Sequence, residues 1–386
     1  MSNFSRDFWE NLDAQTREDY FRYPGPKHDE IVTDREVLAK IEDCIVRLLN
    51  DVRHLQQPSL QFRSRSTWQN VEYIPGVGLQ VKKDCTVSRI SLCRNNSCYK
   101  FGLCLKVLSM IYKLLQSNQT ATKRDLFYND PKLFKSQTTL DHLVDDIGCM
   151  LGVPRHMLHV VATSKGCIAG DLKLTCEDGE IIDCSESASG VSVPVQIHSV
   201  TSVVSKTAKF ILVIEKDATF QRLLSENLPT ILSCIIITGK GVPDVNTRLL
   251  TRILSDRLHL PVLGLFDSDP HGIEIMCVYR FGSLSLAYDS CNLAVRNMKW
   301  IGLLPTDVKR LNLPKQCLLP FSGTDERKCR DLMKRPYMAS HPEILKQVKA
   351  MEEFKHKAEI QSLSHISSTF LGDVYLPLKV KQGEWI

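Results

Sequence analysis

The alternation of apolar and polar stretches is clearest between residues 208 and 275. Three short runs rich in β-branched and apolar residues occupy Phe210–Ile214, Cys234–Thr238 and Val262–Phe266. The segments between these runs have the residue spacing of amphipathic helices and are too long for hairpins. The pattern therefore predicts a mostly parallel sheet with crossover helices, an α/β domain that extends over residues 205–386.

Acidic residues end two of these predicted strands. Glu215 follows the first run, and Asp267 and Asp269 follow the third. Because the carboxyl ends of parallel strands face one crevice, we expect the three carboxylates to converge there. A set of oxygen ligands with this much negative charge suits Mg²⁺. The alternative is that Asp267 or Asp269 serves only as the N-cap of a helix that begins near His271.

The first half of the chain has a helical pattern instead. Thr33 and Glu36 have the spacing of a capping box, and apolar residues at steps of three and four predict a helix over residues 34–53. Its apolar stripe either packs on its own domain or docks a helix of a partner. Further helices are predicted over residues 100–116 and 137–151, with a short segment over 122–130 between them.

A strand over residues 157–162 and a hairpin of residues 172–176 with 181–184 are predicted to follow these helices. Three helices and a hairpin are typical of a winged helix-turn-helix (CAP-like) domain, which places its third helix in the major groove of DNA. The expected architecture is thus a two-domain chain of α+β and α/β units. Its predicted parts are a flexible arm (1–32), a helix and linker (33–84), a winged-helix domain (85–200) and the α/β domain (205–386). Within the second part, the polar, turn-rich residues 56–84 fit either a linker or a strand-and-loop lead-in.

Composition and charge limit the possible functions. The 386 residues are 43% hydrophobic, enough for two or three cored domains, and the chain has neither a membrane-spanning run nor a signal peptide pattern. Fourteen irregularly spaced cysteines without a C-x-x-C motif predict free thiols in a reducing compartment. Residues 86–166 hold eleven Lys or Arg against five Asp or Glu, a balance of +6 beside the +5 of the whole chain. This basic region favours a nucleic-acid partner, although a solvated basic face without a partner has the same composition.

The basic region contains Tyr128, within the sequence Lys123-Arg124-Asp125-Leu126-Phe127-Tyr128-Asn129-Asp130. A tyrosine that attacks a phosphodiester keeps the bond energy in a phosphotyrosine link and needs no water or nucleotide. Arg124 precedes Tyr128 by about one helical turn, so its guanidinium is able to bind phosphate oxygens. For most tyrosines, however, a packing role is the ordinary one.

Both motifs resemble one known family. Glu215 and the Asp267-x-Asp269 pair have the spacing of the Toprim domain of topoisomerases and primases, and Asp-Ser-Asp-Pro-His-Gly over residues 267–272 resembles the topoisomerase VI A-type branch. The segment around Tyr128 resembles the R-D-x-[YF]-Y motif of that branch and of its eukaryotic meiotic relatives, with Phe127 at the first aromatic position. The resemblance runs from about residue 35 to the C-terminus, and the chain is identified as a meiotic member of this family.

The resemblance implies an activity and a setting. Members of the family cleave both DNA strands through a 5′-phosphotyrosyl intermediate, here the programmed breaks that begin meiotic recombination. It implies Tyr128 and Arg124 as catalytic residues, Mg²⁺ held by Glu215, Asp267 and Asp269, and a nuclear location on meiotic chromosomes. The implied partners are double-stranded DNA, a second chain of the same A type, meiotic accessory proteins and a topoisomerase VI B-like subunit, with no membrane. No Walker-type phosphate loop occurs, so ATP hydrolysis would need another protein.

Several further residues are candidates for DNA contacts because they flank these motifs. For the lysines and the arginine an ordinary surface role is equally compatible with the sequence, and Phe220 either wedges against a base or packs under its own helix. The candidates are Lys123, Lys165, Lys216, Phe220, Lys240 and Arg248.

Two other functions remain open at this stage. A Toprim-type nuclease would use water as the nucleophile and Tyr128 only for binding. A non-catalytic DNA-binding scaffold would keep the fold without cleavage. A covalent protein–DNA adduct that survives denaturation distinguishes the first alternative, and a metal titration distinguishes the second.

Overall fold

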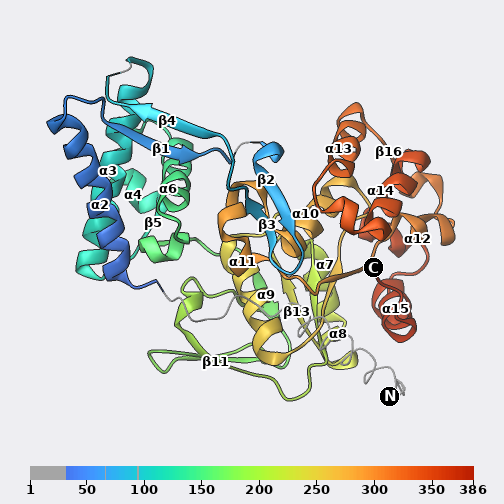
Figure 1. Cartoon of the computed structure of the whole chain (residues 1–386). Helices are drawn as coiled ribbons and strands as arrows, with labels where there is room; N and C mark the ends of the chain where they lie inside the picture. The colour runs from blue at the N-terminus through green and yellow to red at the C-terminus, as the bar shows by residue number, and fades with distance from the viewer. Residues whose placement is uncertain (1–31, 66, 94) are drawn as a thin grey trace.

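The computed structural model describes residues 32–386 apart from positions 66 and 94. Two units lie side by side in it (Figure 1): a mainly helical unit, blue to green, and a larger α/β unit, green to red. Nearly all of the arm predicted over residues 1–32 falls outside the described residues. Among the described helices, none is long and apolar enough to cross a bilayer.

The helical unit is built from α2 (Asp34–Arg53), α3 (Asn95–Ser117), α4 (Lys123–Tyr128), α5 (Pro131–Phe134) and α6 (Gln137–Leu151). The predicted capping box is present at the start of α2, where the Thr33 hydroxyl accepts from the Glu36 amide. Apolar side chains of α2, α3 and α6 share one core, so the inner stripe of α2 packs on its own unit. The predicted strand over 157–162 is shorter, a turn η2 (Arg155–Leu158) followed by β6 (Val160–Val161), which pairs with β5 (Ala121–Thr122).

The segment predicted as a linker is instead structured. Strand β1 (Ser59–Arg63) pairs antiparallel with β4 (Val87–Ser91), and β2 (Val71–Ile74) with β3 (Gly78–Val81) forms a hairpin. That hairpin docks on the α/β unit, because the Tyr73 ring lies edge-on to Phe281 at 5.4 Å and Arg335 stacks over Trp68 at 3.8 Å. Of the two interpretations of residues 56–84, the linker is wrong and the strand-and-loop lead-in is confirmed, since a polar, turn-rich sequence also suits short two-stranded ribbons.

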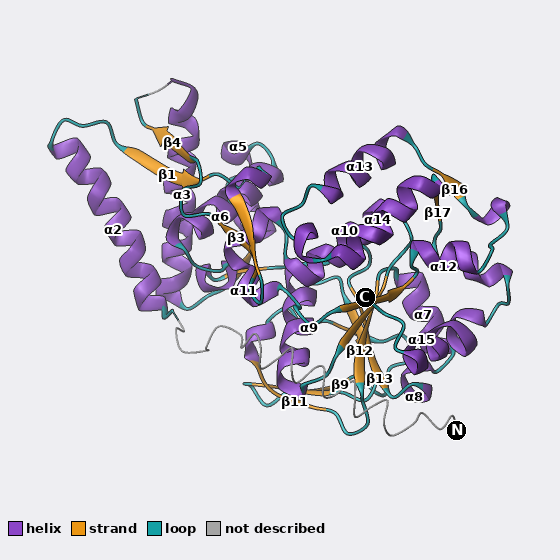
Figure 2. Cartoon of the chain, turned by 45° about the vertical axis from the view of Figure 1, so that its right-hand side comes forward, coloured by secondary structure: helices purple, strands orange, loops and turns teal. Residues whose placement is uncertain are grey.

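The α/β unit contains a six-stranded sheet in the order β10-β7-β13-β12-β14-β15, with helices on both faces (Figure 2). Strands β12 (Phe210–Ile214), β13 (Cys234–Thr238) and β14 (Val262–Leu265) are parallel, as the apolar runs predicted, and β15 (Lys299–Gly302), which was not predicted, continues the parallel sheet. The crossovers are α7 (Asp217–Ser225) with α8 (Leu228–Ile231), then α9 (Val245–Leu258), then α10 (Pro270–Phe281) with η4 (Leu284–Asp289) and α11 (Ser290–Leu293). Every residue of β12, β13 and β14 is buried, as expected for strands covered on both faces.

The predicted wing belongs to the α/β unit. Strands β8 (Lys173–Cys176) and β9 (Ile181–Asp183) form the expected hairpin, but β8 also pairs with β11 (Val200–Val204). Strands β7 (Cys167–Ala169) and β10 (Val191–Ser192) join the large sheet, and Leu172 and Leu174 pack in its core. The division at residue 200 is therefore wrong: the change of unit falls between β6 and β7, because the apolar face of the hairpin is buried against the sheet.

The chain after β15 wraps around the α/β unit. Its helices are α12 (Pro305–Arg310), α13 (Gly323–Met333), α14 (Pro342–Phe354) and α15 (Leu376–Gln382), with the short pair β16 (Leu319–Pro320) and β17 (His356–Lys357) and the turns η7 (Ile360–His365) and η8 (Leu371–Tyr375) between them. The buried Asp307 carboxylate anchors the end of the chain, since it accepts from the Tyr375 hydroxyl at 2.6 Å and from Lys379 at 2.9 Å. All fourteen cysteines are free thiols, ten of them buried.

Candidate active site

Glu215 and Asp267 meet at the carboxyl ends of two adjacent strands. Strand β12 pairs with β14, so Glu215, directly after β12, and Asp267, two residues after β14, lie at the same edge of the sheet. The Asp267 amide donates to Glu215 Oε2 at 2.8 Å. Both residues are buried, at 8% and 2% exposure, although each carries an ionisable carboxyl group. The local pairing of strands thus brings together two acids that are 52 residues apart in the sequence.

Asp269 caps the helix that follows the acids. Its Oδ1 accepts from the Gly272 amide at 2.6 Å, so it is the N-cap of α10, as the alternative interpretation proposed for one of the two aspartates. Asp267 does not cap the helix. Gly272 has no room for a side chain, because a Cβ there would lie 2.5 Å from the Asp267 carbonyl oxygen and 3.0 Å from Glu215 Oε2. The first turn of α10 therefore packs directly on the acids.

The acid crevice, defined here by Glu215, Asp267 and Asp269, accumulates negative charge. The pKa of Glu215 is raised to about 8, mainly by burial and next by the charge of Asp267. Burial also raises the pKa of Asp267, against the opposing hydrogen bonds of Lys216 and Ile360. The charge of Asp269 contributes to both shifts, so all three carboxylates interact.

These residues fit a hard divalent cation in their chemistry. Each carboxylate gives one oxygen to a backbone amide: Glu215 to Asp267, Asp267 to Ile360 and Asp269 to Gly272. Each has a second oxygen, which in Asp267 is paired with Lys216 at 2.7 Å, and carboxylate oxygens are the ligands that Mg²⁺ prefers. Their ligand atoms are not all within 4.8 Å of one another; in the described residues such a group of three occurs at Cys176, Asp178 and Glu180, on the β8–β9 hairpin.

Tyr128 ends the short helix α4 of the helical unit. A capping box between Thr122 and Asp125 begins the helix, and buried Leu126 anchors it. The Tyr128 side chain is 65% exposed, with its ring edge-on to Phe127 at 5.6 Å. Arg124, one turn earlier, is exposed as well. The phenol and the guanidinium are both accessible to a substrate in solution.

The nucleophile candidate and the acids lie on different units. Helix α4 packs against α6, β5 and α5, all of the helical unit. In the described part of the chain, no hydrogen bond, ion pair or ring contact joins Tyr128 to Glu215, Asp267 or Asp269. Within one chain, the described residues thus show no direct contact between the tyrosine and the acids.

The predicted DNA contacts divide into three groups. Lys165 and Lys240 are exposed near the strand ends, where Lys165 Nζ approaches the Lys240 carbonyl at 3.4 Å. Lys216 lies beside the acid crevice, with its Nζ 2.7 Å from Asp267 Oδ2. Lys123 is tied to α6 by a 2.8 Å ion pair with Asp145, which fixes α4 in place.

The DNA-contact role predicted for Arg248 and Phe220 is wrong, and for Phe220 the packing alternative is the one that the structure supports. The Phe220 ring is fully buried in the core, so it packs under its own helix and is unable to wedge between bases. Arg248 is 2% exposed, and burial lowers its pKa to about 10. Both residues lie at motif positions, but their side chains point inward from α7 and α9.

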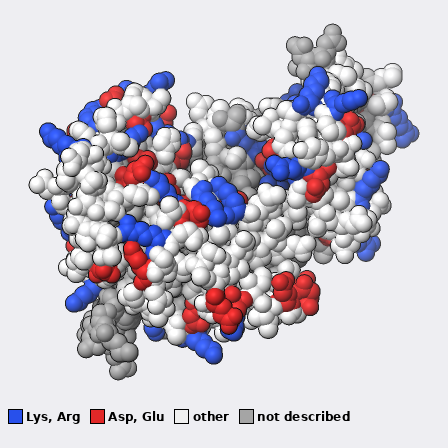
Figure 3. All heavy atoms as spheres, turned by 180° about the vertical axis from the view of Figure 1, so that it is seen from behind, with Lys and Arg blue, Asp and Glu red and all other residues white. Residues whose placement is uncertain are grey.

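Charge on the surface is consistent with an anionic substrate. In the view from behind (Figure 3), Lys and Arg side chains line the hollow between the two lobes, whereas two acidic patches lie along the lower edge. The positive side chains of the two units thus border one another. A phosphate backbone in this region would meet cations from both.

One residue of the crevice was missed by the sequence analysis. Glu359 lies 3.0 Å from Lys216 Nζ, on a segment whose Ala358 bridges to Ser268. The next residue, Ile360, donates to Asp267. No sequence signal marks Glu359, because it is one acid among many in a polar stretch more than ninety residues beyond Asp267.

Comparisons with known proteins match both halves of the chain. The Toprim-domain model of the topoisomerase 6 A-type/Spo11 family matches residues 210–380, and the type IIB DNA topoisomerase model matches residues 99–160. "Meiotic recombination protein SPO11" of Homo sapiens is 47% identical over 95% of this chain and 92% of its own length. The protein of the same name from Mus musculus is 46% identical over 92% of this chain and 90% of its own. The A-type subunit of DNA topoisomerase 6 from Arabidopsis thaliana is 38% identical over 91% and 81%.

Proposed function

This chain belongs to the topoisomerase 6 A-type/Spo11 family and is a topoisomerase-like DNA-cleaving enzyme of meiotic recombination; on that premise we propose that Tyr128 is its nucleophile. The observation that carries the proposal is the exposed phenol on α4, with the exposed Arg124 one turn before it. Nine other tyrosines occur in the chain, but none lies in this motif.

The proposed chemistry is a transesterification. The Tyr128 phenol gives up its proton, its oxygen forms a bond to phosphorus, and the bond to the 3′ oxygen breaks. The DNA strand then carries a 5′-phosphotyrosyl link, and the 3′ oxygen takes up a proton. Arg124 binds the phosphate oxygens, whose negative charge grows in the transition state.

We propose that Glu215, Asp267 and Asp269 hold Mg²⁺. When bound, the ion supplies positive charge beside the scissile phosphate and the departing oxygen. The carboxylates of the acid crevice fix the position of this charge, and their backbone hydrogen bonds hold them in place. Lys165 and Lys240, at the rim, are the proposed phosphate contacts.

The helical unit is the proposed winged-helix DNA-binding domain. Helices α3, α4 and α6 supply its three helices, and the β1–β4 ribbon, which packs on α6 and α3, is the candidate wing in place of the β8–β9 hairpin. The domain proposal thus becomes residues 33–162 for DNA binding with the tyrosine, apart from the β2–β3 hairpin that packs on the other unit, and residues 163–386 for the metal site.

The proposed partners are double-stranded DNA, a second copy of this chain, meiotic accessory proteins and a topoisomerase VI B-like subunit, on chromosomes in the nucleus. A docking face for the B-like partner is supported by the outer surface of α2. Val46, Leu49 and Val52 are more than half exposed there, and Leu55 just beyond the helix is 97% exposed. Such a contiguous apolar stripe is costly to leave in water and suits a helix of a partner.

The covalent intermediate is the direct test. Immunoprecipitation under denaturing conditions, followed by end-labelling of attached oligonucleotides, should detect DNA on the parent protein. Tyr128→Phe should abolish the adduct and change DNA affinity only a few-fold, because one hydroxyl is lost from a basic surface. Tyr99→Phe is the matched control, an exposed tyrosine of α3 that should keep the adduct.

Each of the other results would favour a different interpretation of this protein. An undiminished adduct in Tyr128→Phe would refute the assignment of the nucleophile. Metal-dependent cutting without any adduct would favour the nuclease that uses water. DNA binding without cutting, with or without metal, would favour the scaffold.

A further inference from the structure

Both oxygens of the Asp267 carboxylate are already engaged. The Ile360 amide donates to Oδ1 at 2.8 Å, and Lys216 Nζ lies 2.7 Å from Oδ2. The amide is part of the backbone, so it stays unless the whole segment moves. The lysine is a flexible side chain, so Oδ2 is the oxygen that a cation from solution competes for.

Lys216 has other acceptors within reach. Its Nζ lies 3.0 Å from Glu359 Oε2 and 3.3 Å from Gln361 Oε1. The exposed fractions of the three charged side chains rise from 3% for Asp267 through 28% for Lys216 to 52% for Glu359. The ammonium therefore bridges a buried carboxylate and an exposed one at the rim of the crevice.

We propose that Lys216 is the resident counter-ion of the acid crevice, which a divalent cation displaces from Asp267, and that Glu359 is a positioning residue that holds the displaced ammonium. The inference rests on the proposed metal site. A divalent cation in contact with Oδ2 repels the nearby ammonium by more than the ammonium gains from that singly charged oxygen, so the ammonium is the cation that leaves. Since Nζ already touches Glu359, a change of side-chain torsions is enough to release Oδ2 without breaking the second ion pair.

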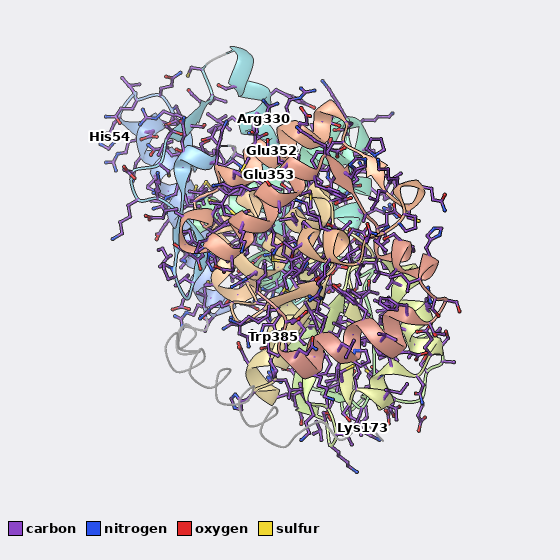
Figure 4. All side chains as sticks on the ribbon, turned by 90° about the vertical axis from the view of Figure 1, so that its right-hand side faces the viewer. His54, Lys173, Arg330, Glu352, Glu353 and Trp385 are labelled. Atoms are coloured by element: carbon purple, nitrogen blue, oxygen red, sulfur yellow. The ribbon has the colours of Figure 1, made fainter. Side chains whose placement is uncertain are left out.

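This arrangement makes a specific prediction for metal affinity without DNA. Titration calorimetry of the full chain with Mg²⁺ alone should give at least about threefold tighter binding for Lys216→Gln than for the parent, because the competing ion pair is gone. Lys173→Gln is the matched control. Lys173 forms a 2.6 Å ion pair with Asp183 on the β8–β9 hairpin and lies near the bottom of the view in Figure 4. Its loss should leave Mg²⁺ affinity unchanged.

Glu359 is tested in two backgrounds. Glu359→Gln alone should weaken Mg²⁺ binding about threefold, since the displaced ammonium has lost its carboxylate and stays on Asp267. In the Lys216→Gln background the same change should have little effect, because no ammonium remains to be held. Glu353→Gln, which removes an exposed acid of α14 labelled in Figure 4, should change neither background.

Three outcomes would overturn the inference. Unchanged or weaker Mg²⁺ binding in Lys216→Gln would mean that the lysine does not compete with metal. An equal loss from Glu359→Gln in both backgrounds would mean that Glu359 acts on the metal directly. No loss from Glu359→Gln in the parent background would mean that Glu359 does not hold the ammonium.

Asp267→Asn separates these failures from failure of the metal site itself. If this variant binds Mg²⁺ as the parent does, the proposed metal site is wrong and the inference falls with it. If Asp267→Asn loses binding while Lys216→Gln matches the parent, the site stands and only the role of Lys216 is refuted.

Discussion

Glu215 illustrates how function opposes stability at the scale of one residue. The carboxylate is buried beside Asp267 and within the influence of Asp269, and its pKa is raised to about 8 by burial and by the Asp267 charge. At any pH at which the Glu215 carboxyl is ionised in the unfolded chain, its burial in the folded chain costs free energy of folding. Buried, interacting carboxyl groups with raised pKa values are typical of functional sites, and here they suit the binding of a cation.

Replacement of Glu215 by Gln should stabilise the fold while it weakens the metal site. Between pH 4.5 and 8 the unfolded chain releases the Glu215 proton and the folded chain keeps it, so the parent loses stability as pH rises. Glu215→Gln removes this loss, which is at most about 1.4 kcal/mol per pH unit. Denaturant unfolding with a chelator at pH 5.5 and pH 8 measures the difference.

The same variant should bind Mg²⁺ at least about tenfold more weakly and cleave DNA less, because one of three anionic ligands is lost. The amide oxygen of Gln is able to accept from the Asp267 amide, which preserves the local structure. Cleavage equal to that of the parent at low Mg²⁺ would remove Glu215 from the metal site.

Gly272 should not tolerate even a methyl group. A Cβ would lie 2.5 Å from a backbone oxygen of Asp267, so Gly272→Ala must shift the first turn of α10 or the acids. We expect a destabilisation of about 1–3 kcal/mol and weaker Mg²⁺ binding. The control is Gly323→Ala at the start of α13, where no atom lies within 4 Å of the new Cβ. Equal unfolding midpoints for the two variants would contradict the close packing.

At the scale of elements, short turns join the two units. Turn η2 carries His156, and turn η3 (Ile197–Ser199) carries His198; their rings stack at 3.5 Å between centroids. One turn belongs to the helical unit and the other follows the strands of the α/β unit. Burial, together with the charges of His198 and Arg155, lowers the pKa of His156 to about 3. The stack therefore requires a neutral His156 ring.

Acid should weaken this junction. Below pH 6.5 the unfolded chain takes up a proton on His156, while the folded chain excludes it until about pH 3. The free energy of unfolding should therefore fall as pH falls, by at most about 1.4 kcal/mol per pH unit for this residue. His156→Phe keeps an aromatic ring against His198 and should lose less stability between pH 7 and pH 5. Identical pH dependence in denaturant unfolding of the two proteins would refute the role of His156.

At the scale of the whole molecule, the tyrosine and the acids are separated. Tyr128 projects from the helical unit, and Glu215 lies in the α/β unit. The docked β2–β3 hairpin and the histidine stack link the two units within one chain. Two copies related by two-fold symmetry would offer each tyrosine the acids of the other copy, and a duplex cut on both strands presents two equivalent phosphates.

A mixed dimer tests this shared site. We expect one Tyr128→Phe chain paired with one Glu215→Gln chain to nick a single strand, because one composite site collects both defects and the other is intact. Sites built within one chain would each carry one defect, and no cleavage would occur. Strand-specific end-labelling on a defined duplex measures the number of cuts per dimer.

The controls pair each variant with a parent chain. If those dimers cut DNA and the purified mixed dimer makes no nick, the shared site is refuted. Double-strand cutting by the mixed dimer would instead mean that neither substitution is disabling.

The sequence by itself determined the local elements and the motif residues. The boundaries of α2, α6 and the first two parallel strands follow from periodicity and capping, and every residue of those strands is buried. Because the carboxyl ends of parallel strands face one crevice, the sequence also predicted that Glu215 and Asp267 meet. These features depend on interactions between residues that are near in sequence or on a topology with few alternatives.

Only the tertiary structure decided which unit each short strand joins and which polar residues are buried. The β8–β9 hairpin has the sequence of a wing, but its apolar face meets the large sheet. Phe220 and Arg248 occupy motif positions and point inward, whereas Glu359 has no motif and reaches Lys216 across the fold. Long-range packing sets these outcomes, because the local sequence determines the spacing of apolar residues along an element but not which other element packs on its apolar face.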